Sequence, residues 1–169
     1  MKILIVIAPE GYQDIEYETP KKVLQDAGYE IITTSTQEVA HGSLGGSTKV
    51  DLLLDQVNPS DYIAIVFVGG PGSHFYFDYQ PALNLAKDFY NSGKLTTAIC
   101  AGPSILANAG LLKGKTVTSF SGQAENLKAN GATYTGNPVE QDGTIITANG
   151  PSSAQVFGEK IAKALKSLN

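Results

Sequence analysis

Short apolar segments alternate along the chain with helix-like segments, and this alternation constrains the fold more than any other feature. The strand-like segments are rich in β-branched residues and run over residues 2–8, 30–35, 62–68, 95–99 and 144–148. Helical periodicity predicts helices over residues 15–27, 81–91, 104–108 and 152–168. Strands that are separated by helices favour a mainly parallel sheet with helices on both faces. The sequence therefore predicts an α/β sandwich.

Shorter segments complete the prediction. Residues 41–50 contain Gly-Ser-Leu-Gly-Gly-Ser-Thr and indicate a β-hairpin, and Asp142-Gly143 indicates a tight turn between two further strands, 139–141 and 144–148. Short strands are also expected over residues 115–119 and 132–134. Asp14 is a candidate cap for the first helix, and Gly28 would end it. Because no linker or repeat interrupts the 169 residues, we expect one domain over residues 1–169.

The composition excludes several classes of function. The net charge is −4, and all 12 basic residues are lysines that form no long run, so nucleic acid and anionic membranes are not expected as partners. A single cysteine excludes an intrachain disulfide framework and favours a reducing, cytoplasmic location. Two histidines and scattered carboxylates do not form a metal-binding pattern. We therefore expect neither a metal nor another cofactor.

That cysteine, Cys100, lies where a strand meets a helix. The strand over residues 95–99 runs into Cys100, and Gly102-Pro103 then forces a sharp turn. A nucleophile at such a corner points out of the sheet, and amides of the following helix favour its thiolate. The corner predicts a pKa for Cys100 below the roughly 8.5 of a free thiol. The alternative is an unreactive cysteine that packs as a small apolar side chain.

Three segments should meet at the carboxyl edge of the sheet, where parallel sheets form their sites. They are the loop after Ala8, the Gly69–Gly72 loop and the corner at Cys100. Glu16 follows the first strand closely; it either complements the helix dipole or points at the cysteine, where a carboxyl can donate a hydrogen bond to sulfur.

The glycine loop allows two interpretations. It resembles a phosphate cradle, but Pro71 removes one amide that a cradle would use. The amides of Gly70 and Ala101 are better suited to form an oxyanion hole beside Cys100.

Only His41 and His74 are available as a histidine partner for the cysteine. His41 lies in a polar turn and is expected at the surface. His74 follows the glycine loop and can reach the mouth of the site, although a histidine among aromatic residues also serves in packing.

Together these segments resemble the ThiJ/PfpI superfamily, which includes PfpI-type proteases and the deglycase branch of the Parkinson-disease protein. The resemblance covers nearly the whole chain and rests on residues 2–6, 14–16 with Pro20, 49–51, 68–70, 98–103 and 142–147. It implies a flavodoxin-like three-layer sandwich, a nucleophile elbow at Cys100 and a buried glutamate at Glu16. It also implies a homodimer or a larger homo-oligomer.

Two positions depart from the superfamily pattern. PfpI-type proteases carry a histidine directly after the elbow cysteine, where this chain has Ala101. The deglycase branch takes a histidine from a later segment that resembles residues 116–121, and there this chain has Phe120. Cysteine-dependent hydrolysis needs a group that takes and returns protons. Neither usual histidine is present to do so.

Three functions follow, in order of preference. The first is a stress-related, redox-responsive protein in which an oxidant oxidises Cys100 and Glu16 bonds the oxidised sulfur. The second is a cysteine-dependent hydrolase or a glyoxalase/deglycase-like enzyme acting on small carbonyls or amides, with His74 or Glu16 handling protons. The third is a non-catalytic holdase or binding module that uses a groove formed by a dimer, and an exposed apolar groove would favour it.

Overall fold

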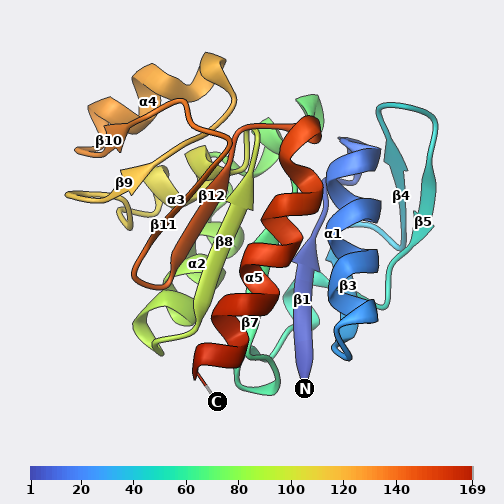
Figure 1. Ribbon diagram of the computed structural model, residues 1–169. Coiled ribbons are helices and arrows are strands. Elements are labelled where there is room, and N and C mark those ends of the chain that lie inside the picture. Colours follow the sequence, from blue (N-terminus) through green and yellow to red (C-terminus); the bar gives the residue numbers. More distant parts are fainter. Residues whose placement is uncertain (169) are drawn as a thin grey trace.

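The computed structural model describes residues 1–168 and is built around a seven-stranded sheet in the order β11-β12-β8-β7-β1-β3-β6 (Figure 1). All neighbouring strands run parallel except β11, which pairs antiparallel with β12. The strands of this sheet are β1 (Lys2–Val6), β3 (Glu30–Ser35), β6 (Leu52–Leu53), β7 (Ala64–Phe67), β8 (Leu95–Ile99), β11 (Val139–Asp142) and β12 (Ile145–Ala148).

Helices cover both faces of the sheet. Helix α1 (Asp14–Asp26) packs beside α5 (Ala154–Leu168) on the face nearer the viewer in Figure 1. On the opposite face, α2 (Gln80–Asn91) and α3 (Pro103–Asn108) pack on each other and on β8. The central strands β1, β7 and β8 are buried along almost their whole length because both of their faces are covered. The predicted flavodoxin-like three-layer sandwich is confirmed.

Two small sheets lie outside this sandwich. The predicted hairpin forms from β4 (Val39–Gly42) and β5 (Ser47–Lys49), and β2 (Glu10–Tyr12) pairs with β4. The short strands β9 (Thr116–Val117) and β10 (Thr133–Tyr134) pair with each other beside α4 (Ala124–Ala129). The sequence did not predict β2, β6 or α4. Each is short: α4 has fewer than two helical turns and the two strands have only two or three residues, so none shows a clear hydrophobic period.

The cap of α1 differs from the prediction. Gln13, not Asp14, is the N-cap, and its side chain accepts a hydrogen bond from the Glu16 amide at 2.9 Å. The Asp14 carboxylate instead accepts hydrogen bonds from the amides of Leu44 and Gly46 at 3.2 and 2.8 Å. Asp14 therefore fixes the β4–β5 turn against the start of α1, a contact between residues too distant in sequence to be predicted locally.

No helix among residues 1–168 combines the length and the apolar character that crossing a lipid bilayer requires.

Candidate functional site

Cys100 occupies a strained turn between β8 and α3. Its φ of 62° makes it the only non-glycine residue among those described with a positive φ. The amide of Cys100 donates to the carbonyl of Ala148 at 2.9 Å, and the Gly102 amide donates to Ile99 at 2.9 Å. These two hydrogen bonds hold Cys100 in a backbone conformation whose strain, for a residue other than glycine, is of order 1–3 kcal/mol. Such strain is typical of nucleophile elbows.

Glu16 lies in the first turn of α1 and is completely buried, with 0% of its surface exposed. Its Oε1 accepts a hydrogen bond from the Gly69 amide at 3.1 Å, whereas Oε2 is buried without a nitrogen or oxygen partner among the described residues. Burial raises the pKa of Glu16 from 4.5 to about 7, although hydrogen bonds from the Cys100 side chain and the Gly69 amide lower it. The free oxygen can therefore hold a proton near neutral pH.

The predicted low pKa of Cys100 is wrong. Burial, followed by the charge of Glu16 and a hydrogen bond to it, raises the pKa of Cys100 from 9.0 to about 12. Hydrogen bonds from the amides of Ala101 and Gly70 lower it, but not enough to compensate. The helix adds little because α3 has only six residues and begins with Pro103, which has no amide hydrogen.

The Gly69–Gly70 loop brings Glu16 and Cys100 together. A β-carbon on Gly69 would lie 2.6 Å from Oε1 of Glu16 and 2.7 Å from the β-carbon of Cys100. One on Gly70, whose φ is 104°, would lie 2.5 Å from the amide nitrogen of Gln13. Because neither glycine has a side chain, the Gly69–Gly70 loop lies close to both the start of α1 and the elbow at Cys100. In this position the Gly70 amide donates a hydrogen bond to the Cys100 sulfur.

A cavity of about 400 Å³ opens over the cysteine. It is lined by Gln13, Glu16, Gly70, Pro71, His74, Cys100, Ala101, Phe120 and Pro151. All five residues singled out in the sequence, namely Cys100, Glu16, His74, Gly70 and Ala101, therefore lie at one site. The volume falls in the range typical of small-molecule sites, roughly 300–1,000 Å³.

The two histidines take different positions. His74 lies in the 3₁₀ segment Pro71–Tyr76, is exposed at the cavity, and stacks on Phe77 with ring centroids 4.4 Å apart. His41 lies on the exposed hairpin, where its Nδ1 is 3.0 Å from Oε1 of Glu10. Among residues 1–168, no cluster of three or more histidine, cysteine or carboxylate side chains is placed to hold a metal ion.

The sequence did not identify Gln13 and Pro151 as lining residues. Pro151 follows the carboxyl end of β12, and Gln13 follows the segment after β1, so both lie at the sheet edge that carries Cys100. The rule that locates sites at this edge would have found both.

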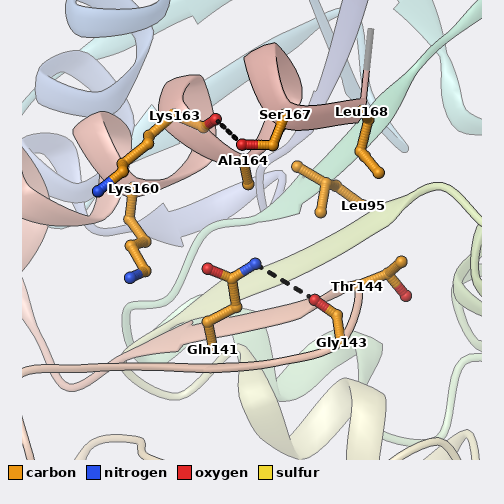
Figure 2. A pocket seen from close by; sticks show the side chains of 9 residues that line it. All are labelled: Leu95, Gln141, Gly143, Thr144, Lys160, Lys163, Ala164, Ser167 and Leu168. Carbon is orange, nitrogen blue, oxygen red and sulfur yellow. Dashed lines mark hydrogen bonds between the residues drawn. The ribbon is translucent and has the colours of Figure 1, made fainter.

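A second pocket lies at the opposite edge of the sheet. Figure 2 shows it between α5 and the hairpin of β11 and β12, with Lys160, Lys163 and Gln141 at its rim and Leu95 and Leu168 at one end. Its volume is about 170 Å³. None of its lining residues is a cysteine, a histidine or a carboxylate, so it offers no nucleophile paired with an acid or base.

Comparison with known proteins finds relatives that match nearly the whole chain. A family model described as the DJ-1/PfpI family matches residues 1–164. An uncharacterized protein of Methanocaldococcus jannaschii is 40% identical over 99% of this chain and 84% of its own length. The protein named deglycase PfpI, from Pyrococcus furiosus, is 33% identical over 98% of this chain and 100% of its own length.

The crystal structure of a ThiJ/PfpI domain protein from Brachyspira murdochii has the same fold. It superposes with a TM-score of 0.97 at 36% sequence identity, and the match covers 99% of this chain and 98% of that one. The resemblance found in the sequence motifs is thus supported by both sequence and structure.

Proposed function

This chain belongs to the DJ-1/PfpI family, and from that premise we propose that it is a stress-related, redox-responsive member. An oxidant converts Cys100 to sulfenic or sulfinic acid, and Glu16 bonds the oxidised sulfur. The observation that carries the proposal is the hydrogen bond between the side chains of Cys100 and the buried Glu16, whose Oε2 has no nitrogen or oxygen partner among the described residues. An oxidised sulfur carries oxygen atoms that accept hydrogen bonds, and a protonated carboxyl at this position supplies the donor.

Proton transfer to Glu16 is the source of reactivity in this proposal. With a pKa of about 12, Cys100 holds little thiolate at neutral pH by itself. With a pKa of about 7, the Glu16 carboxyl is partly ionised there and accepts the thiol proton. The amides of Gly70 and Ala101, which already bond the sulfur, stabilise the negative charge that develops on it.

We expect peroxide to oxidise Cys100 faster as the pH rises through about 7, because the carboxylate form of Glu16 is the one that accepts the proton. Glu16→Gln should slow the reaction by at least about tenfold and remove the inflection near pH 7, since the amide cannot take the proton and the rate then follows only the thiolate fraction of Cys100. Mass spectrometry after mild hydrogen peroxide treatment measures the sulfenic and sulfinic fractions. Cys100→Ser, which lacks the thiol, is the negative control for this measurement.

Glu18→Gln is the matched control because Glu18 is exposed on the same helix. If wild type and Glu16→Gln oxidise with the same rate and pH profile, Glu16 has only a structural role. If Cys100 does not oxidise under mild peroxide, the redox function is wrong.

A second candidate function is supported by one observation: His74 lines the same cavity as Cys100. In this alternative Cys100 attacks a small carbonyl or amide, and His74 replaces the histidines that the family carries elsewhere. The protein named deglycase PfpI makes such chemistry the natural assay. No comparable observation favours the third candidate, a holdase or binding module.

We expect wild type to consume methylglyoxal and to hydrolyse peptides slowly, and His74→Ala to change these rates by less than about tenfold. The reason is that His74 is exposed and stacked on Phe77, whereas a positioned acid–base group contributes about 10²–10⁴-fold. Fast turnover that Cys100→Ser abolishes would reverse the ranking of the two functions. If His74→Ala abolished it too, His74 would be the base.

The homodimer or larger homo-oligomer and the cytoplasmic location that the family resemblance and the composition suggest stay predictions.

A further inference from the structure

The cavity over Cys100 has apolar walls. Pro71, Phe120 and Pro151 come from three separate segments and, with Ala101, surround the approach to the sulfur. Among the described residues, no lysine lines the cavity, and the chain has no arginine. A volume of about 400 Å³ far exceeds what hydrogen peroxide needs and leaves room for an organic group.

Phe120 is fixed at this place by its own backbone. Its amide donates to the carbonyl of Cys100 at 2.8 Å, so the residue that bears the ring is hydrogen-bonded to the elbow itself. The exposed fraction of Phe120 is 50%, so its ring is not buried in the hydrophobic core. The Phe120 ring lines the cavity over Cys100 and is open to solvent. It therefore offers an apolar contact to a ligand in that cavity.

From these observations we infer that the oxidant recognised by Cys100 is an uncharged organic hydroperoxide with an apolar alkyl or aryl body. This inference rests on the proposed redox function and specifies its substrate class. The organic body would pack against Phe120, Pro71 and Pro151 while the peroxide group meets the sulfur. The lining described holds no lysine or arginine but does hold the Glu16 carboxyl, and this disfavours hydroperoxides that carry a carboxylate.

The reaction balances without a further reactant. Glu16 takes the proton of the Cys100 thiol, and the sulfur attacks the terminal oxygen of the hydroperoxide. The oxygen–oxygen bond breaks, the terminal OH goes to the sulfur, and the alkoxide leaves. The proton held by Glu16 passes to the alkoxide, which gives the alcohol. Sulfur loses two electrons and the peroxide gains them, so the products are the sulfenic acid of Cys100 and one alcohol.

The test compares cumene hydroperoxide with hydrogen peroxide as oxidants of Cys100, each relative to its rate with N-acetylcysteine. We expect the cumene/hydrogen peroxide rate ratio for the protein to exceed that of the free thiol by about tenfold or more, as contacts in apolar pockets allow. Phe120→Ala should bring the ratio close to that of the free thiol, and Phe120→Leu should keep part of the preference. Labelling of the sulfenic acid with dimedone reports each rate.

Phe75→Ala is the matched control, because Phe75 is a phenylalanine of similar exposure, 48%, that does not line the cavity. It should leave the ratio unchanged. If hydrogen peroxide oxidises Cys100 but the protein's ratio equals that of N-acetylcysteine, the substrate class is wrong and the redox function stands. If neither oxidant modifies Cys100, the redox function itself fails.

Discussion

Replacing Gly70 with alanine is expected to lower the free energy of unfolding by about 3 kcal/mol or more. Gly70 has φ 104° and ψ 166°, a conformation open essentially to glycine alone, which costs another residue about 1–3 kcal/mol. The new methyl group would also lie 2.5 Å from the Gln13 nitrogen and 2.6 Å from the Gly11 carbonyl oxygen. Both are backbone atoms that cannot rotate away, and overpacking adds about 1–3 kcal/mol.

Gly45→Ala separates backbone strain from crowding. Gly45 also has a positive φ, 96°, but an added β-carbon there meets nothing within 4 Å. This control should cost only about 1–2 kcal/mol, the strain of the left-handed conformation. Urea unfolding followed by circular dichroism measures both variants. Equal losses for Gly45→Ala and Gly70→Ala would show that the close approach of the Gly70 loop to the segment before α1 does not limit stability.

Glu16→Gln is expected to stabilise the folded protein by about 3 kcal/mol near pH 8 and to have little effect near pH 4. Burial raises the pKa of Glu16 from 4.5 to about 7, and each pKa unit corresponds to about 1.4 kcal/mol. Below about pH 4.5 the carboxyl is protonated in both the folded and the unfolded chain, and its burial carries no charge penalty. As the pH rises from 4.5 to about 7, the unfolded chain ionises first, so stability is lost.

Glutamine keeps the shape of the side chain and an oxygen that accepts the Gly69 hydrogen bond, yet it never ionises. The measured quantity is the difference in unfolding free energy between wild type and variant at several pH values. Glu18→Gln, on the exposed side of α1, should show no such dependence on pH. A difference that stays constant from about pH 4 to 8 would mean that the raised pKa of Glu16 is not real.

The sequence alone determined the sandwich and the location of the site. Buried parallel strands are continuous apolar runs, so β1, β7 and β8 are visible without knowledge of their neighbours. The corner at Cys100 is equally local, because Gly102 and Pro103 lie within three residues of it. The rule that sites form at the carboxyl edge of a parallel sheet predicts that the loop after the first strand, the glycine loop and Cys100 meet, and it left open whether Glu16 points at the cysteine.

Only the tertiary structure decided how these groups ionise. The Ala101 amide at the elbow lowers the pKa of Cys100, which is the direction that the sequence predicted. Desolvation outweighs it, and desolvation depends on every segment that excludes water from the site. The fold also decides the position of Oε2 of Glu16, which is buried without a nitrogen or oxygen partner among the described residues, and that of Phe120, whose own amide donates to the carbonyl of Cys100. Local patterns encode backbone geometry, whereas burial and long-range contacts, set by the whole fold, fix the chemistry of the site.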